Sequence, residues 1–335
     1  MPGNRQIIVR QLPKGTLTEA HFELREADRP TLADGEALIR TILMSIDAAN
    51  RAWMQGATYR EAVKAGDVMH TYAIGEVVES KDASLAPGDI VGVESRWAET
   101  VAVKARRAQK LPPVRPLSHL LSIYGIAGKT AYHGLVGVGR PQAGETVVVS
   151  AAAGSVGMYV GQIAKALGCR AVGIAGGADK CAWVSGTLGF DACVDYRAGN
   201  LFKDLKVACP EGIDVYFDNV GGNILETALF QMNLKGRVVC CGAVSQYDSA
   251  APVGPRNVPG MIVVKRLRME GFIVMDFAVE DAKAEADLKR WVTEGRLKVA
   301  EDIIDGLENA PAALIGLLAG KNRGKRMVRV APDPV

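Results

Sequence analysis

The chain has 335 residues, of which 48% are apolar, and carries a formal net charge of +3 from 40 basic and 37 acidic side chains. This composition predicts one large or two smaller folded domains, and the near balance of charge gives no indication of nucleic acid or an anionic membrane as a partner. There is no apolar run of about 18 residues, and residues 1–10 do not resemble a secretory signal. We therefore expect a cytoplasmic protein without a membrane span.

The first third of the sequence has the pattern of a β-rich domain. Three short segments rich in β-branched residues are predicted as strands, at 37–44, 74–79 and 89–94. The Pro-Gly pair within 85–89 indicates a turn before the third of them. Prolines then cluster within 112–116, and a helix is predicted from Ser118, with the serine as its N-cap. This cluster marks an expected change of domain.

From residue 144 onward, short apolar segments alternate with segments of helical spacing. The predicted strands are 146–150, 170–175, 192–195, 215–218, 238–241 and a last one at 326–330. The predicted helices include 157–167, 180–188 and 224–233. Strand–helix–strand repeats of this length indicate a parallel, doubly wound sheet, so the predicted fold class is α/β.

A glycine-rich turn joins the strand at 146–150 to the helix that follows it. It ends in Gly154, Ser155, Val156 and Gly157, with alanine where the first glycine of a G-x-G-x-x-G pattern often stands. Small residues let the backbone approach a pyrophosphate, and the helix N-terminus offers N–H groups and the positive end of its dipole to an anion. The strand–turn–helix context predicts a dinucleotide site, whereas the pattern alone would indicate only a tight turn.

The end of the second strand distinguishes between the two nicotinamide cofactors. An NAD site usually places an acid about 20 residues past the glycines, where it holds the ribose 2′-hydroxyl. Here the strand ends in Gly176 and Gly177, and Lys180 follows as a candidate to neutralise a 2′-phosphate. Asp179 is the competing acid, but it lies past the usual position. This pattern predicts NADPH as the cofactor.

Several stretches resemble a known family. They lie at 144–157, 161–165, 189–191, 212–222, 254–257, 271–274, 306–311 and 320–325. Through them the sequence resembles the medium-chain dehydrogenase/reductase superfamily, and within it the zinc-independent group of prostaglandin reductases, leukotriene B4 12-hydroxydehydrogenases and curcumin reductases. The Asp-Asn-Val-Gly-Gly run at 218–222 and the stretch at 320–325 are typical of this group.

The resemblance implies a GroES-like, β-rich catalytic domain from residues 1–125 and 301–335, and a Rossmann NADPH-binding domain from residues 126–300. It implies that Gly154 to Gly157 hold the pyrophosphate and that Lys180 and Tyr196 contact the adenosine 2′-phosphate. It places these residues around the nicotinamide side: Asn219, Cys241, Gly242, Ala243, Val244, Ser245, Phe272, Ile273, Val274 and Asn322. A homodimer joined through the Rossmann sheets is also implied. The family's reaction reduces a carbon–carbon double bond conjugated to a carbonyl.

Three segments depart from the family's pattern. The family's Asp-Pro-Tyr-Met-Arg is Asp-Ala-Ala-Asn-Arg at 47–51, and its Met-Pro-Gly-Leu-Thr-Ala-Tyr is Ile-Ala-Gly-Lys-Thr-Ala-Tyr at 126–132. The segment 69–73 differs as well. The resulting candidates for a substrate pocket are Asn50, Arg51, Lys129 and Thr130. Lys129 would favour an acidic or phenolic substrate if it faced the pocket, and otherwise it is a surface lysine lying along apolar neighbours.

The sequence predicts no metal. Zinc-dependent relatives use an early cysteine, a Gly-His-Glu segment and a later cysteine. Here no cysteine precedes Cys169, and the histidines at 21, 70, 119 and 133 lack metal-ligand spacing. The cysteines are expected to be reduced core thiols. Because alcohol oxidation in this superfamily normally relies on zinc, an activated alkene is the expected small-molecule substrate.

Reduction of such an alkene places negative charge on its carbonyl oxygen, which requires a preorganised donor. The candidates are Tyr247, Tyr59 and the ribose hydroxyl of the cofactor. Tyr247 is favoured because it ends the cofactor-lining segment, and a purely structural tyrosine is the alternative. Two other functions stay open: a zinc-free NADPH quinone reductase of the same superfamily, and a non-catalytic NADPH-binding protein.

Overall fold

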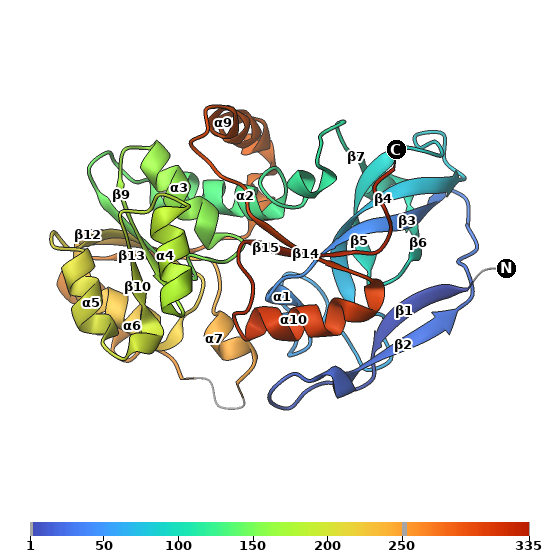
Figure 1. Cartoon of the computed structure of the whole chain (residues 1–335). Coiled ribbons are helices and arrows are strands. Elements are labelled where there is room, and N and C mark those ends of the chain that lie inside the picture. Colours follow the sequence, from blue (N-terminus) through green and yellow to red (C-terminus); the bar gives the residue numbers. More distant parts are fainter. Residues whose placement is uncertain (1–2, 250–252, 335) are drawn as a thin grey trace. The chain divides into compact units, whose positions relative to one another are not determined.

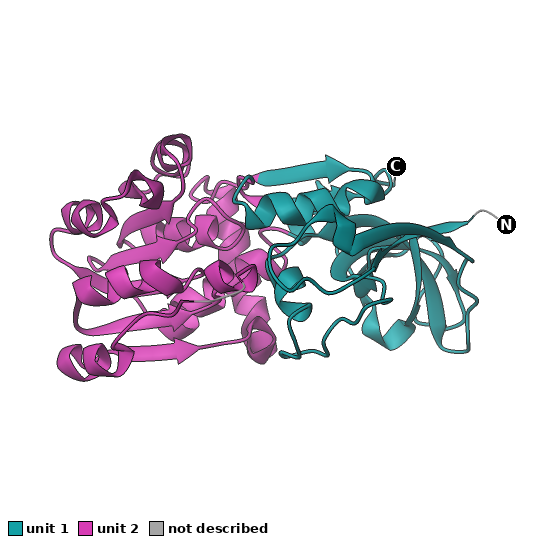
Figure 2. Ribbon diagram, turned by 90° about the horizontal axis from the view of Figure 1, so that it is seen from below, with its two compact units in different colours: residues 1–121, 301–321, 326–335 teal, residues 122–300, 322–325 magenta. Residues whose placement is uncertain are grey.

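Two compact units make up the chain, and each is assembled from segments far apart in the sequence (Figure 2). The computed structural model describes residues 3–249 and 253–334. Unit 1 consists of residues 1–121, 301–321 and 326–335, and unit 2 consists of residues 122–300 and 322–325. The return of 322–325 to unit 2 was not part of the predicted division, which assigned all of 301–335 to the first domain.

Unit 1 is built around two sheets (Figure 1). In the smaller one, β1 (Asn4–Val9) pairs antiparallel with β2 (Phe22–Ala27). The larger one has seven strands in the order β14-β15-β3-β4-β5-β7, and β6 pairs with β3. These strands are β3 (Glu36–Ser45), β4 (His70–Ser80), β5 (Ile90–Arg96), β6 (Thr100–Lys104), β7 (Gln109–Lys110), β14 (Glu301–Asp305) and β15 (Lys325–Arg329). The helices are η1 (Glu19–His21), α1 (Ala49–Trp53), η2 (Ala105–Arg107), η3 (Leu117–Leu120), η7 (Leu307–Asn309) and α10 (Ala310–Leu318).

The apolar pattern of the first third explains the core of unit 1. The predicted strands at 37–44, 74–79 and 89–94 are confirmed as parts of β3, β4 and β5. Ile39 and Val77 pack in one cluster beneath the sheet. Trp97 is fully buried and stacks on Phe22 with their ring centroids 5.5 Å apart, which joins the smaller sheet to the core.

Unit 2 contains a parallel six-stranded sheet in the order β10-β9-β8-β11-β12-β13, which confirms the predicted α/β fold. Its strands are β8 (Thr146–Ser150), β9 (Arg170–Ala175), β10 (Ala192–Asp195), β11 (Ile213–Asp218), β12 (Met232–Cys240) and β13 (Arg268–Gly271). Its helices are α2 (Ile126–Tyr132), η4 (His133–Gly139), α3 (Gly157–Ala166), α4 (Ala178–Gly186), η5 (Tyr196–Ala198), α5 (Leu201–Ala208), α6 (Gly222–Gln231), α7 (Val244–Tyr247), α8 (Val258–Lys265), η6 (Val274–Glu280) and α9 (Asp281–Thr293). The strand order reverses between β8 and β11, and ligands of doubly wound folds bind beyond the carboxyl ends at such a point.

Strand β8 shows why this sheet is buried on both faces. Val147 and Val149 pack in a cluster with residues of α2, α3, α4 and α9. Val148 points to the opposite face and packs in a second cluster with residues of α6. Alternate residues of a strand face opposite sides, so a continuous apolar run is required where helices cover both.

Among the differences from the sequence predictions are three in helical segments. The helix predicted from Ser118 is only the short 3-10 turn η3, and the longer helix α2 begins at Ile126. The helix predicted at 224–233 ends at Gln231, because β12 begins at Met232. The π-helical segment η4, which continues α2, has no counterpart among the predictions.

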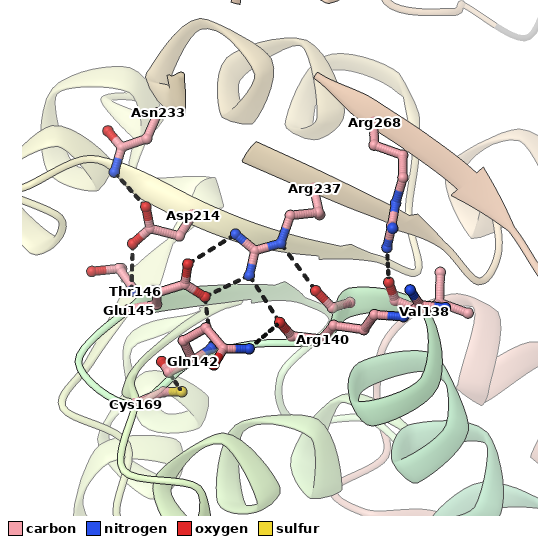
Figure 3. A network of polar contacts seen from close by, with 11 residues as sticks. Val138, Arg140, Gln142, Glu145, Thr146, Cys169, Asp214, Asn233, Arg237 and Arg268 are labelled. Carbon is pink, nitrogen blue, oxygen red and sulfur yellow. Dashed lines mark hydrogen bonds and ion pairs between the residues drawn. The ribbon is translucent and has the colours of Figure 1, made fainter. Parts of the chain in front are cut away.

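A polar network fixes the edge of the sheet at which its strands begin (Figure 3). The Arg237 guanidinium donates to the Glu145 carboxylate at 2.9 Å and to the Gly139 carbonyl at 3.1 Å. Arg268 donates to the Val138 carbonyl. Asp214 accepts from the backbone N–H of Thr146 at 2.9 Å. The last carbonyls of η4 are thereby bonded to the sheet, on the edge opposite the glycine-rich turn.

Candidate functional site

The glycine-rich turn follows the carboxyl end of β8 and leads into α3. Ala151 has a positive φ of 52°, which turns the chain sharply after the strand. A Cβ at Gly157 would lie 2.3 Å from the Ala151 carbonyl oxygen, so only glycine permits this close approach. The Ser155 hydroxyl is buried and has no hydrogen-bond partner among the described residues. Small residues, the N-terminus of α3 and this hydroxyl together suit a bound anion.

The segment at 322–325 lies against the same turn. The Gly324 N–H donates to the Ala153 carbonyl at 2.9 Å, and Gly324 forms an isolated bridge with Gly154. A Cβ at Gly324 would lie 2.2 Å from the Ala300 carbonyl oxygen. Asn322 is buried, and its side-chain amide donates to the Gly324 carbonyl at 2.9 Å. Asn322 therefore shapes this segment next to the turn.

At the end of β9, two side chains lie over Gly176. A Cβ there would come within 2.9 Å of both Tyr196 Cε1 and Arg197 Nε. The Arg197 guanidinium lies 5.6 Å from the centre of the Tyr196 ring. Lys180 lies in the first turn of α4, where its N–H donates to the Gly177 carbonyl at 3.1 Å. The structure thus gathers Lys180, Tyr196 and Arg197 around the end of this strand.

Sequence reasoning missed Arg197. The available signal was its place directly after Tyr196 in the sequence. Asp195, an acid that contacts this strand end, was not predicted either. The Asp195 carboxylate accepts from the N–H groups of Gly177 and Arg197, at 2.8 and 2.9 Å, through one oxygen. Asp195 therefore holds the turn and the arginine backbone together.

Asp218 joins the ends of β8 and β11 and was not among the site residues predicted from the sequence. It is 3% exposed, and its carboxylate accepts from Ser150 Oγ at 3.1 Å, Tyr216 Oη at 3.0 Å and the Gly221 N–H at 3.0 Å. Burial raises the pKa of Asp218, although the hydrogen bonds that it accepts act in the opposite direction. The sequence signal for Asp218 was its place at the start of the Asp-Asn-Val-Gly-Gly run at 218–222.

The segment from Cys241 to Tyr247 is attached to the turn after β11 through its backbone. The N–H groups of Cys241 and Gly242 donate to the Asp218 carbonyl, at 2.9 and 3.1 Å. Burial, the largest cause, and the nearby Asp218 charge raise the pKa of the Cys241 thiol to about 12, so it stays protonated at neutral pH. The hydroxyl of Tyr247, the last residue of α7, accepts from the Ala243 N–H at 3.1 Å.

The adjoining residues tie this loop to the end of β8. The Val244 N–H donates to the Asn219 carbonyl at 3.1 Å, and the Ser245 hydroxyl and N–H both donate to the Val220 carbonyl. The Asn219 side-chain amide donates to the Ser150 carbonyl at 2.8 Å. The predicted nicotinamide-side residues 219 and 241–245 therefore form one continuous, hydrogen-bonded rim beyond β8, β11 and β12.

Phe272, Ile273 and Val274 follow the carboxyl end of β13. The Phe272 ring lies edge-on to Phe217 of β11, with ring centroids 6.3 Å apart. A Cβ at Gly134 would lie 2.5 Å from the tip of Phe272, so glycine in η4 is needed for this ring to pack. The segment contributes an apolar group at the same edge of the sheet.

The candidate substrate residues of unit 1 are mostly engaged inside that unit. The Asn50 side chain is 1% exposed, accepts from the Asp47 N–H at 2.8 Å and donates to the His70 carbonyl at 2.8 Å. Arg51 is 2% exposed and donates to the Gly15 carbonyl at 2.8 Å. Both act within the fold around α1. Tyr59 is 53% exposed and lies edge-on to Trp53.

The candidates in α2 have different surroundings. Thr130 is 8% exposed. The Lys129 ammonium lies 2.7 Å from Asp281 Oδ2 and 2.9 Å from Glu285 Oε1, both in α9. Burial by itself would lower the pKa of Lys129, but the hydrogen bonds and charges of these two carboxylates outweigh it and raise the pKa. Its charge is therefore balanced within unit 2, which weakens the idea that it meets a substrate anion.

Comparison with known proteins decides the family. The family profile for the N-terminal domain of oxidoreductase matches residues 5–111, and the profile for zinc-binding dehydrogenase matches residues 155–290. The chain is 40% identical to the NADPH-dependent curcumin reductase of Escherichia coli over 98% of both chains. It belongs to the curcumin reductase and prostaglandin reductase group of the medium-chain dehydrogenases/reductases.

Two further members of this group resemble the chain along most of its length. Bovine prostaglandin reductase 1 is 40% identical over 94% of this chain and 95% of its own. The crystal structure of CurA from Vibrio vulnificus in complex with NADPH has a TM-score of 0.93 and 37% identity, and covers 98% of this chain and all of that one. The group resemblance predicted from the sequence is confirmed.

The name of the second profile raises the question of a metal. Within residues 3–249 and 253–334, no three His, Cys, Asp or Glu side chains are grouped so that they could hold a metal ion.

Over the same residues, no helix combines the length and the apolar character that a membrane crossing requires.

Proposed function

We propose that the protein uses NADPH to reduce a carbon–carbon double bond conjugated to a carbonyl, as an enone or enal reductase. The observation that carries this proposal is the arrangement along one edge of the unit 2 sheet. It combines a glycine-rich turn, a cationic group of residues at the end of β9, and a rim with an apolar residue beyond β11 and β13. The names of the curcumin reductase and the bovine prostaglandin reductase, each 40% identical to the chain, support the same reaction.

The end of β9 supports NADPH over NADH. Lys180, Tyr196 and Arg197 would hold the 2′-phosphate, because two cations and a phenol hydroxyl suit a dianion. Asp195 is the acid that could otherwise bind a ribose 2′-hydroxyl. One of its oxygens already accepts two backbone N–H groups. The pyrophosphate would lie on Gly154 to Gly157, where the N-terminus of α3 begins.

The rim supports the nicotinamide half of the proposal. Bound NADPH would supply the hydride that adds to the β-carbon of the substrate. We assign to Tyr247 the donation of a hydrogen bond to the substrate's carbonyl oxygen, or of a proton to its α-carbon. Tyr59 of unit 1 is the second candidate. The Ala243 N–H bonded to Tyr247 Oη would hold the phenol in place during this step.

Other features of the proposal concern the whole protein. We propose a metal-free reaction, because no cysteine precedes Cys169 in the sequence. We propose residues 1–125 and 301–335 as the catalytic domain and 126–300 as the cofactor domain. We further propose a cytoplasmic homodimer without nucleic-acid or membrane partners. The cytoplasm would keep its six cysteines reduced, and these are free thiols in the structure.

The test is the oxidation of NADPH by the purified protein with an enal, an aromatic enone and a quinone side by side. We expect turnover with the enal or enone, slower turnover with NADH, and no loss of rate after dialysis against a chelator. Turnover with the quinone alone would make the protein a quinone reductase. NADPH binding without turnover of any acceptor would make it a binding protein.

The same assay tests Tyr247. Tyr247→Phe should lower kcat by about 100-fold, the usual contribution of a positioned acid, with a much smaller change in the KM for NADPH. Tyr59→Phe serves as the comparison. A normal kcat for Tyr247→Phe with a reduced kcat for Tyr59→Phe would transfer the role to Tyr59.

A further inference from the structure

Lys129 is a charged residue in the segment 126–132, one of the three segments that depart from the family's pattern. It lies in α2, its side chain is 16% exposed, and its ammonium is shared between Asp281 and Glu285 of α9. These two acids are four residues apart on one helix, where like charges repel. Lys129 therefore holds together a pair of carboxylates that would otherwise destabilise the start of α9.

Asp281 connects this ion pair to a buried histidine. Its second oxygen, Oδ1, lies 3.0 Å from His133 Nε2, and the His133 side chain is 3% exposed. Asp281 is also the first residue of α9, where a negative charge is favoured by the helix dipole. Its carboxylate is thus bound from two sides, by Lys129 from α2 and by His133 from η4.

The histidine in turn contacts the aromatic residues of the apolar segment. Its ring stacks on Phe277 of η6, with ring centroids 5.0 Å apart and an interplanar angle of 15°. Phe277 lies edge-on to Phe272, with centroids 6.1 Å apart, and Phe272 lies edge-on to Phe217. A continuous chain of contacts therefore runs from Lys129 through Asp281 and His133 to the segment 272–274.

We propose that Lys129, Asp281 and His133 form a positioning cluster that fixes the segment 272–274, and with it the nicotinamide side of the cofactor site. This inference rests on the proposed function. Lys129 is a positioning residue in it, not a catalytic one: it acts through Asp281 and His133 on the two phenylalanines. With Lys129 removed, the repulsion between Asp281 and Glu285 displaces the start of α9 and loosens the Phe277 and Phe272 rings.

Binding of two ligands, NADPH and adenosine 2′,5′-bisphosphate, distinguishes a positioning role of Lys129 from a general effect on stability. Adenosine 2′,5′-bisphosphate has the adenosine and 2′-phosphate of NADPH but no nicotinamide. Lys129→Met keeps most of the aliphatic stem and removes the charge. We expect it to weaken NADPH binding by about tenfold and to lower kcat, while the bisphosphate binds as to the wild type. Asp281→Asn should act in the same direction, and Lys129→Arg should restore NADPH binding.

The matched control is Lys165→Met. Lys165 also lies in unit 2, where its ammonium lies 2.7 Å from Asp191 Oδ1, and its variant should bind both ligands normally. Unchanged NADPH affinity and kcat in both Lys129→Met and Asp281→Asn would overturn the positioning proposal, as would equal weakening of the two ligands. Failure of the wild type itself to bind NADPH would instead reject the proposed function.

Discussion

At the scale of single residues, the proposed preference for NADPH depends on the end of β9. A doubly charged phosphate is stabilised by charge-assisted hydrogen bonds, whereas a ribose hydroxyl needs an acceptor. Gly176 leaves the space that Tyr196 and Arg197 occupy, since a side chain there would collide with both. Asp195 lies close by, but its oxygen Oδ1 accepts backbone N–H groups. In the proposed site, cofactor selectivity would depend on where an acid is bonded as well as on whether an acid is present.

The prediction at this scale concerns Arg197. Arg197→Ala should raise the KM for NADPH by about tenfold and leave the KM for NADH nearly unchanged, because one charge-assisted bond to the 2′-phosphate is lost. Lys180→Ala should behave in the same way. Steady-state kinetics with both cofactors provide the measurement, and Lys203→Ala on the exposed side of α5 is the control. Equal effects on the two cofactors would remove Arg197 from the 2′-phosphate site.

At the scale of elements, the turn that joins β8 to α3 requires its backbone to pack closely. Gly157 is the first residue of α3, and its neighbour across the turn is a backbone carbonyl that no rotamer change can displace. A strand buried on both faces and a helix packed directly against it leave little freedom to accommodate an added atom. The turn is therefore a part of the proposed cofactor site that leaves no room for an added side chain at Gly157.

Gly157→Ala should consequently destabilise the protein by about 1–3 kcal/mol and strongly weaken NADPH binding. Thermal unfolding and cofactor titration measure the two effects. Gly186→Ala at the end of α4 is the matched control, since nothing lies within 4 Å of the added carbon. It should leave NADPH binding unchanged and raise stability by at most about 1 kcal/mol. Equal behaviour of the two variants would contradict the role assigned to the turn.

The elements also show what the sequence could and could not predict. The alternation of buried strands and helices predicted the sheet of unit 2, because a parallel sheet covered on both faces requires continuous apolar strands. The glycine-rich turn was also recognisable from the sequence, because Gly157 permits the close approach of the backbone to the Ala151 carbonyl oxygen. The ion pairs of Lys129 were not predictable, because they join α2 to residues about 150 positions later. The second cation, Arg197, became apparent only when β9 and β10 were seen side by side.

At the scale of the whole molecule, the sheet of unit 2 ends in a strand at which the proposed homodimer could form. Strand β13 is the last in the order, and on its outer side no strand of the described residues pairs with it. Val263 and Val264 of the preceding helix α8 are 72% and 66% exposed. An open edge beside an exposed apolar pair is the arrangement expected at the interface of the proposed homodimer.

The double variant V263E/V264E should therefore be monomeric at concentrations where the wild type is a dimer, because charged groups would be buried at the interface. Sedimentation velocity measures the change. Val207→Glu, on α5, is an appropriate control because Val207 is 75% exposed and lies in another element of the unit. A dimer that persists in V263E/V264E would place the interface elsewhere, and a monomeric wild type would reject the homodimer.

The return of residues 322–325 to unit 2 has a consequence for biosynthesis. Strands β14 and β15 of unit 1 come from the last 35 residues, and Gly324 completes the surroundings of the glycine turn. During translation, neither unit can acquire all its contacts until residues 322–329 have been made. A nascent chain stopped before residue 301 would expose the unfinished edge of the larger unit 1 sheet, and such edges promote aggregation. Neither unit can therefore be obtained intact by cutting the chain at a single position.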